Sequence, residues 1–129
     1  MKKIAFIGSG TMGTALATAA CKGIDPSEVV ITDVVTEKGQ KLADELGCNF
    51  VETNGEAIKA AHYVVFCVKP QFLKSVLEEV KPVFAACAEE GQEKIIVSIV
   101  AGVEVSTYMK ELELEGKNVP VIRILPNTA

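Results

Sequence analysis

Three closely spaced glycines after a short apolar run are the feature that most constrains the fold of this chain of 129 residues. Ile4-Ala5-Phe6-Ile7 is followed directly by Gly8-Ser9-Gly10-Thr11-Met12-Gly13, which matches the pattern GxGxxG. Between a strand and a helix, the first glycine allows a tight turn, the second lets the backbone approach a pyrophosphate, and the third lets the helix pack closely on the strand. We therefore predict a strand over 3–8, a helix over 11–21 and a dinucleotide-binding turn between them.

Strand-like and helix-like segments alternate along the rest of the chain. Apolar, β-rich runs predict further strands at 29–32, 49–51, 63–68, 94–100 and 119–125. The intervening segments predict helices at 36–46, 54–61, 70–86 and 105–114. Only 5% of the residues are aromatic, so aliphatic side chains must build the core, as in buried parallel sheets. Residues 1–129 are thus predicted to form one α/β domain of the Rossmann type: a doubly wound, mostly parallel sheet in the order 3-2-1-4-5-6, with helices on both faces.

Two prolines shape the prediction for the helix after the fourth strand. Pro70 is expected to open it, because the first turn does not need the N–H that proline lacks. Pro82 predicts a kink or an early end. Four apolar residues at helical spacing predict the buried face: Phe72, Val76, Leu77 and Val80.

Composition excludes several classes of function. The formal net charge is −4 with no basic run, so nucleic acid is not expected as a partner. No apolar stretch approaches the roughly 20 residues that span a membrane, and we expect a cytoplasmic protein. The cysteines, which show no CxxC spacing, are predicted to be structural free thiols, and no metal site is expected. His62, the only histidine, is predicted to precede the fourth strand, at the end of the sheet opposite the ligand site, and is not assigned a catalytic role.

Asp33 is the candidate residue for choosing the cofactor. It follows Gly13 by 20 residues, since 33 minus 13 is 20, and this spacing is typical of the acidic residue that binds an adenosine ribose. Its carboxylate would accept a hydrogen bond from the 2′-hydroxyl and repel a 2′-phosphate, which favours NADH. Asp33 could instead be an exposed strand-end residue or a helix-capping residue, and Lys38 or Lys41 could still reach a phosphate. The choice between NADH and NADPH therefore stays open.

Two later segments are predicted to line the same edge of the sheet. Val68-Lys69-Pro70 ends the fourth strand, beside the point where strand order reverses and ligands bind in such sheets. We expect its backbone to matter more than the Lys69 ammonium, which is equally compatible with a surface charge. Ala101-Gly102 follows the fifth strand, and such small residues would let a flat ring approach closely. The alternative for this pair is a simple turn that ends the strand.

Taken together, these segments resemble pyrroline-5-carboxylate reductase, the last enzyme of proline biosynthesis. The resemblance covers the whole chain. Besides the glycine motif it rests on three segments: Val68-Lys69-Pro70-Gln71, Ser98-Ile99-Val100-Ala101-Gly102-Val103 and Arg123-Ile124-Leu125-Pro126-Asn127-Thr128. The activity it implies is hydride transfer from NADPH or NADH to the C=N carbon of 1-pyrroline-5-carboxylate, giving proline.

The resemblance also implies roles for individual residues. It places Val68, Lys69, Pro70, Ala101 and Gly102 near the nicotinamide. Asn127 and Thr128 would lead into the active site, and Asn54 would lie near the adenosine ribose. No catalytic acid or base is identified among these residues.

Some features depart from the family pattern. Asp33 stands where members that use NADPH often have Ser, Thr or Arg, Leu125 and Ala129 replace a typical Met and Pro, and His62 replaces an Asp. The family also has a C-terminal helical domain that forms the homo-oligomer and completes the substrate pocket, and we expect it to be absent from these 129 residues. The isolated chain is then expected to bind the dinucleotide without reducing substrate. The alternatives are a non-catalytic nucleotide-binding or sensor module and a related dehydrogenase acting on hydroxy acids or prephenate.

Overall fold

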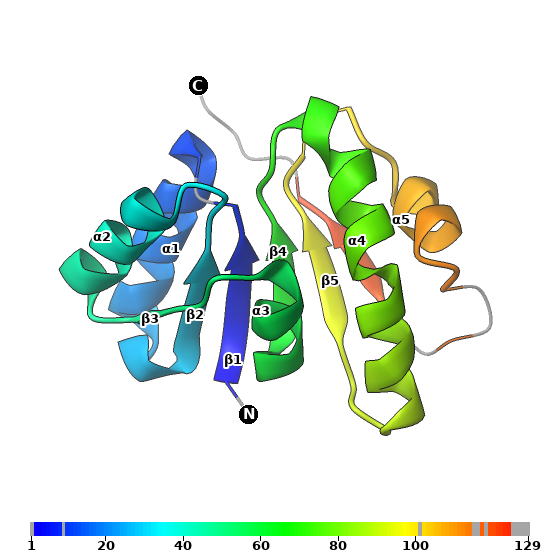
Figure 1. Ribbon diagram of the computed structural model, residues 1–129, viewed down its shortest axis with the longest axis horizontal. Helices are drawn as coiled ribbons and strands as arrows, with labels where there is room; N and C mark the ends of the chain where they lie inside the picture. Colours follow the sequence, from blue (N-terminus) through cyan, green and yellow to red (C-terminus); the bar gives the residue numbers. More distant parts are fainter. Residues whose placement is uncertain (1, 9, 101, 115–116, 118, 125–129) are drawn as a thin grey trace.

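Six parallel strands form the centre of the molecule, and the computed structural model describes residues 2–8, 10–100, 102–114, 117 and 119–124 (Figure 1). The apolar runs seen in the sequence become these strands because both faces of the sheet are buried by helices. The strands are β1 (Lys2–Ile7), β2 (Val29–Thr32), β3 (Asn49–Phe50), β4 (Ala61–Phe66), β5 (Ile95–Ser98) and β6 (Val121–Arg123).

The strand order is β3-β2-β1-β4-β5-β6, and every neighbouring pair is parallel. β1 lies in the middle, with Ile4 opposite Val29 of β2 on one side and Tyr63 of β4 on the other. From β1 the chain adds strands outward to β3, and it then returns to add β4, β5 and β6 on the other side. The predicted doubly wound fold and strand order are confirmed, and the order reverses between β1 and β4.

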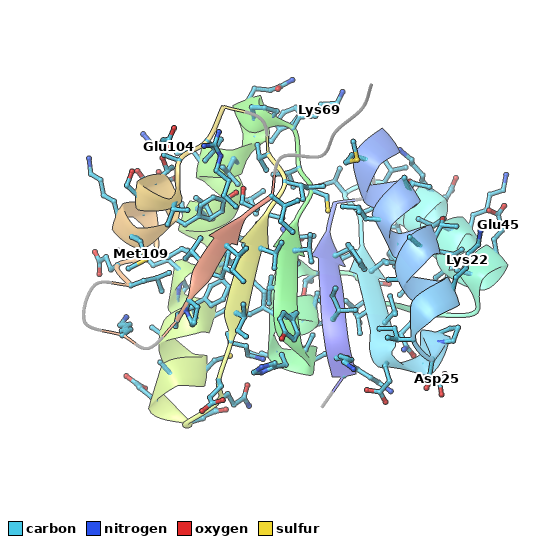
Figure 2. The ribbon with its side chains drawn as sticks, turned by 180° about the vertical axis from the view of Figure 1, so that it is seen from behind. Lys22, Asp25, Glu45, Lys69, Glu104 and Met109 are labelled. Atoms are coloured by element: carbon cyan, nitrogen blue, oxygen red, sulfur yellow. The ribbon has the colours of Figure 1, made fainter. Side chains whose placement is uncertain are left out.

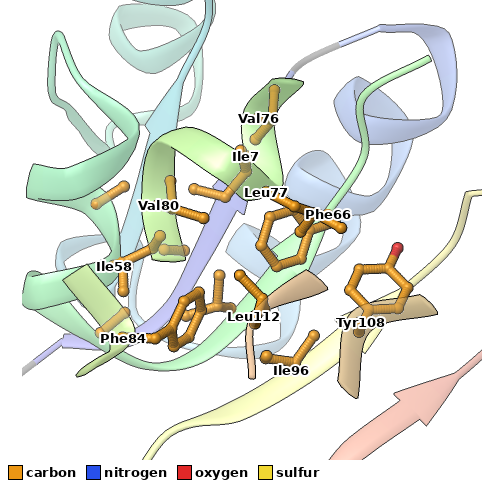
Figure 3. Packing of buried hydrophobic residues seen from close by; sticks show 14 of the residues in the cluster. Ile7, Ile58, Phe66, Val76, Leu77, Val80, Phe84, Ile96, Tyr108 and Leu112 are labelled. Carbon is orange, nitrogen blue, oxygen red and sulfur yellow. The ribbon is translucent and has the colours of Figure 1, made fainter. Parts of the chain in front are cut away.

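Helices cover both faces of the sheet and divide the core in two. A short 3-10 helix, η1 (Pro26–Glu28), precedes β2, and the α-helices are α1 (Thr11–Gly23), α2 (Thr36–Leu46), α3 (Asn54–Ala60), α4 (Pro70–Glu89) and α5 (Val105–Glu111). Successive strand residues alternate between the faces, so Phe6 packs with the cluster under α1 and α2, whereas Ile7 joins the cluster under α3, α4 and α5. Figure 3 shows the second cluster, in which the ring of Phe66 lies near the rings of Phe84 and Tyr108, tilted against both.

α4 corrects two of the expectations drawn from the sequence. The helix does not end near Ala86 but continues past Pro82 to Glu89, because Val80, Phe84 and Cys87 are buried on either side of the proline, which is itself exposed. Phe72 does not belong to the buried face, because the residue that points inward in the first turn is Leu73, one position further round the helix. Phe72 is 55% exposed.

Most other boundaries differ from the predictions by one to three residues. Strand β4 runs from Ala61, which pairs with Lys2, to Phe66. Cys67 and Val68 therefore lie beyond its end. The fifth and sixth strands are shorter than predicted, at Ile95–Ser98 and Val121–Arg123. Helix α5 ends at Glu111 rather than Leu114 because the chain reverses at Glu113, whose φ is 53°, and closes with a hydrogen bond from Leu114 N–H to the Met109 carbonyl.

Candidate functional site

The carboxyl ends of β1 and β4 lie side by side at the point where the strand order reverses. Gly8 N–H donates to the Thr32 carbonyl across 3.1 Å, and Cys67 N–H donates to the Ile7 carbonyl across 2.8 Å, which extends the sheet by one bond on each side of β1. In open α/β sheets this is the place where ligands bind. Figure 2 shows Lys69, after β4, and Glu104, after β5, at this edge of the sheet, with Asp25 at the opposite edge.

Gly8 and Gly13 have the conformation and packing that the motif requires. The φ of Gly8 is 91°, in the left-handed region that side chains disfavour, and a Cβ there would lie 3.1 Å from Cγ1 of Val68. A Cβ on Gly13 would lie 2.9 Å from the Gly8 carbonyl oxygen and 3.0 Å from Cβ of Cys67. The two glycines therefore let α1 start directly against the ends of β1 and β4.

Gly10 has a different environment. It is the N-cap of α1, it accepts the first helical hydrogen bond from Thr14 N–H at 2.8 Å, and no side chain caps the helix. A Cβ on Gly10 would meet no atom within 4 Å. Thr11 and Met12 form the first turn behind it. This leaves open space in front of N–H groups at the positive end of a helix dipole, an environment that stabilises an anion.

Asp33 follows β2 on the adenosine side predicted from the sequence. Its Oδ1 accepts a hydrogen bond from Val35 N–H at 2.9 Å, so the carboxylate shapes the turn that leads into α2. Gly39 of α2 lies against it, because a Cβ there would be 3.1 Å from Cβ of Asp33. A pocket of about 200 Å³ is lined by Thr14 of α1 and by α2 residues, namely Lys38, Lys41, Leu42 and Glu45. Lys38 and Lys41, the two candidate ligands of a phosphate, thus line one pocket between α1 and α2.

The nicotinamide side predicted from the sequence lies after β4 and β5. Val68 contacts Gly8, Lys69 is exposed, and Pro70 is the first residue of α4. Gly102 has a φ of 73° and lies in the loop between β5 and α5. The structure therefore brings Gly8, Gly10, Gly13, Asp33, Val68, Lys69, Pro70 and Gly102 to one edge of the sheet.

Other predicted residues lie elsewhere or outside the described residues. The Asn54 amide at the start of α3 donates to Glu79 Oε2 of α4 at 3.2 Å. His62 lies inside β4, not before it, and its Nδ1 is 2.8 Å from the Glu93 carbonyl oxygen, near the amino end of the strand. Ala101, Asn127 and Thr128 fall outside the described part of the chain, and their assigned roles stay predictions.

A buried hydroxyl pair is the feature that sequence reasoning missed. Ser98, at the end of β5, hydrogen bonds through Oγ to the Tyr108 hydroxyl of α5, and both residues are fully buried. Val100 N–H donates to the same Ser98 Oγ at 3.4 Å. The available signal was a tyrosine on the inner face of a short helix, since a buried tyrosine hydroxyl generally finds a partner.

One cysteine, Cys67, lies at this edge of the sheet, directly after β4. All four cysteines are free. Burial raises the pKa of the Cys67 thiol, beside Gly13, to about 12, so that it remains protonated near neutral pH.

Within the described residues, no group of three or more His, Cys, Asp or Glu side chains is placed to hold a metal ion. A pocket of about 560 Å³ beside α5 contains none of the predicted site residues.

None of the helices in the described part of the chain has the length and apolarity needed to cross a membrane.

Comparison with known proteins confirms the resemblance drawn from the sequence. Pyrroline-5-carboxylate reductases of Corynebacterium melassecola and Methanosarcina acetivorans are 33% and 36% identical to this chain, with alignments that cover 99% of it but only 46% and 45% of those proteins. The solved structure of the pyrroline-5-carboxylate reductase of Coxiella burnetii superposes with a TM-score of 0.79 at 27% identity, covering 98% of this chain and 44% of that one.

The chain thus spans less than half the length of the relatives it matches. The family model described as NADP oxidoreductase, coenzyme F420-dependent, matches residues 3–102, which include the glycine motif and the ends of β4 and β5. The chain belongs to this family, and over its whole length it is similar to pyrroline-5-carboxylate reductases.

Proposed function

We propose that this chain binds NAD(P)H across the carboxyl edge of its sheet and supplies the cofactor-binding part of a pyrroline-5-carboxylate reductase. The turn between β1 and α1 is the main support for this proposal. Gly8 turns in left-handed backbone and Gly13 lets α1 approach Cys67, while Gly10 leaves open space before the helix N-terminus. A pyrophosphate in that space accepts hydrogen bonds from the backbone of the first turn, and its charge is stabilised by the helix dipole.

In the proposed reaction, 1-pyrroline-5-carboxylate is reduced at the carbon of its C=N bond and protonated at the nitrogen to give proline, and a bound NADH or NADPH would supply the hydride. Because the hydride would come from the cofactor, the task of this chain is to bind the cofactor and hold its nicotinamide in one orientation toward the substrate. We assign the pyrophosphate to the turn at Gly10, Thr11 and Met12. The nicotinamide end is assigned to Val68, Lys69, Pro70, Ala101 and Gly102, and the substrate side to Asn127 and Thr128. The proton donor is left unassigned.

We further propose that turnover requires a helical domain that forms the homo-oligomer and completes the substrate pocket. One observation supports this proposal: this chain spans less than half the length of its relatives. The roles proposed above concern the cofactor and the entrance to the substrate site, which leaves the rest of the substrate pocket to that domain. The cytoplasmic location expected from the sequence stays a prediction.

Cofactor choice depends on the α1–α2 side of the site. The Asp33 carboxylate opposes a 2′-phosphate and can bind a ribose 2′-hydroxyl, whereas Lys38 and Lys41 line the neighbouring pocket and attract a phosphate. Because Asp33 follows β2 directly and also shapes the turn into α2, we propose that NADH binds at least as well as NADPH. A contact of Asn54 with the adenosine ribose stays part of the proposal, with its amide released from Glu79.

Titration calorimetry of the 129-residue chain with NADH and NADPH tests the binding proposal. Gly10→Val should abolish or greatly weaken binding without unfolding the protein, because a Cβ at this position meets no atom within 4 Å and the side chain enters the space assigned to the pyrophosphate. Gly23→Val is the matched control, since a Cβ on Gly23 at the far end of α1 also meets no atom within 4 Å. Equal affinities of wild type and Gly10→Val would overturn the assignment.

The activity proposal is tested by following NAD(P)H absorbance with 1-pyrroline-5-carboxylate. The 129-residue chain should show binding without turnover. Sustained turnover by this chain alone would contradict the need for a further domain, and turnover with a hydroxy acid or prephenate instead would contradict the substrate assignment.

A further inference from the structure

A buried chain of hydrogen bonds links the start of the loop between β5 and α5 to the protein interior. Tyr108 of α5 bonds through its hydroxyl to Ser98 Oγ, and the same oxygen accepts the N–H of Val100, the second residue of the loop. All three residues are at most 3% exposed, so water does not replace these partners. Figure 3 shows Tyr108 at the margin of the cluster under α4 and α5, with its ring near Phe66.

The backbone of β5 fixes one side of this loop. Ile99 N–H donates to the Phe66 carbonyl of β4 at 3.3 Å, and Ile124 N–H donates to the Ser98 carbonyl at 2.8 Å. The chain then passes to Gly102, whose φ of 73° starts the return toward α5. Backbone bonds therefore place the end of the strand, whereas the Tyr108 hydroxyl is the side-chain link between the start of the loop and the helix that follows it.

We propose that Tyr108 is a positioning residue that acts through Ser98 to hold the loop after β5 at the height needed for the nicotinamide half of the cofactor. This inference rests on the proposed function. In a doubly wound sheet the cofactor crosses the reversal point, so its two halves lie on opposite sides of β1. Asp33 marks the β2 side, which leaves the ends of β4 and β5 for the nicotinamide half. In this proposal Tyr108 does not contact the cofactor. It positions the backbone of the loop after β5, which does.

Tyr108→Phe separates this role from simple packing, because it removes the hydroxyl and keeps the buried ring. The loop start then loses its link to α5, and we expect the dissociation constant of NADH or NADPH to rise about three- to tenfold, the usual effect of one hydrogen bond. The dissociation constants of ADP and adenosine 2′,5′-bisphosphate, which lack the nicotinamide half, should not change. A purely structural defect would weaken all four ligands together or none of them.

Fluorescence of the reduced nicotinamide gives a second measure of the same end of the cofactor. Its emission changes when the ring leaves water, so the change on binding should be smaller in Tyr108→Phe at saturating cofactor. Tyr63→Phe is the matched control, because Tyr63 is the only other tyrosine and lies within β4, away from the loop. It should leave every affinity and the emission change unaltered.

Ser98→Ala should weaken NAD(P)H binding at least as much as Tyr108→Phe, because it removes the bond to Tyr108 and also the acceptor of the Val100 N–H. The double variant should bind no more weakly than Ser98→Ala, since the two changes share the bond between the hydroxyls. Ser98→Ala also serves as the test if Tyr108→Phe does not fold. Wild-type affinity for NAD(P)H in both single variants, or an equal loss for ADP, would overturn the inference while the proposed function stands. If the wild-type chain binds neither ADP nor the dinucleotides, the proposed function fails and the inference fails with it.

Discussion

Gly13 of α1 lies directly against Cys67, the first residue after β4: a Cβ on the glycine would be 3.0 Å from Cβ of the cysteine and 2.9 Å from the Gly8 carbonyl oxygen. This contact joins the start of the first helix to the two strand ends between which the strand order reverses. Because the nearest atom is a backbone oxygen and the next is a Cβ, which does not move when its side chain rotates, little space can be gained by moving a side chain.

Gly13→Ala should therefore destabilise the fold by about 1–3 kcal/mol, the usual cost of overpacking a close contact. Urea unfolding followed by circular dichroism measures the change. Gly10→Ala is the matched control in the same turn, and its midpoint should equal that of the wild type because the added methyl meets no atom within 4 Å. A Gly13→Ala protein as stable as the wild type would show that α1 can shift away from Cys67.

The buried thiols predict how stability changes with pH. The pKa of Cys67 is about 12 in the fold, against an ordinary value of 9.0, and that of Cys48 is raised to about 12 as well, in both cases chiefly by burial. Above pH 9 the unfolded chain loses protons that the folded chain keeps, so stability should fall as the pH rises from about 9 toward 12. Urea midpoints across this range should drop less steeply in Cys67→Ala.

Alkylation by iodoacetamide offers an independent check on the same thiols, since only thiolates react. At mildly alkaline pH, the folded protein should react slowly at Cys67 and Cys48, and the urea-unfolded protein should react quickly at both. Peptide mapping identifies the labelled residues. Rapid labelling of Cys67 in the folded state would contradict its raised pKa.

Asp33 should set the preference between the two dinucleotides. Asp33→Ser removes the charge facing a 2′-phosphate and the partner of the ribose hydroxyl, so the ratio of affinities should shift toward NADPH by about 1–3 kcal/mol. Asp33→Asn keeps an oxygen that can accept from Val35 N–H and loses only the charge, which separates repulsion from the shape of the turn. Calorimetry at low and high salt distinguishes a direct contact from a screened field.

Lys38→Ala complements that experiment from the pocket between α1 and α2. If Lys38 reaches a 2′-phosphate, the variant should lose affinity for NADPH and keep its affinity for NADH. A strong NADPH preference that neither Asp33→Ser nor Lys38→Ala changes would mean that the 2′ position lies elsewhere.

Lys94 is a buried ammonium that closes the end of α3, and its loss should be costly. Its Nζ donates to the carbonyls of Ile58 at 2.6 Å, Ala61 at 2.5 Å and Lys59 at 3.4 Å. Lys94→Met keeps the length of the side chain but removes the buried ammonium that these carbonyls bind, and we expect a loss of about 1–3 kcal/mol in unfolding free energy. Lys59→Met, on the exposed face of the same helix end, should change stability by at most about 0.5 kcal/mol.

Much of the fold was predictable because its signals are local. An apolar run before a glycine turn, Pro70 at a helix start and Gly47 after α2 act through a few neighbouring residues, and each marks the boundary that the structure shows. Gly47 ends α2 with a φ of 74°, which glycine adopts without the penalty that other residues meet. Alternation of such units then restricts the sheet to very few topologies.

The gathering of the candidate residues at one edge of the sheet was predictable for a related reason. In a parallel sheet every strand ends at the same edge, so residues that follow strands gather there even when they are far apart in sequence, as Gly8, Asp33 and Val68 do. Spacing could not show that Asp33 binds Val35 N–H or that the Asn54 amide turns to Glu79, because these depend on which side chains lie within reach after folding.

Only the tertiary structure decided the features that arise between distant segments. Pro82 is tolerated within α4 because burial on both sides of it holds the helix, and Lys94 is buried because the end of α3 happens to present carbonyls to it. Tyr108 and Ser98 are ten residues apart in sequence and belong to different elements, and only the packing of α5 on β5 brings their hydroxyls together. The sequence by itself determined the units, their order and the edge where they end, since backbone geometry and apolar pattern act locally. The packing of those units determined which polar groups were buried away from water. Those groups then needed hydrogen-bond partners within the protein.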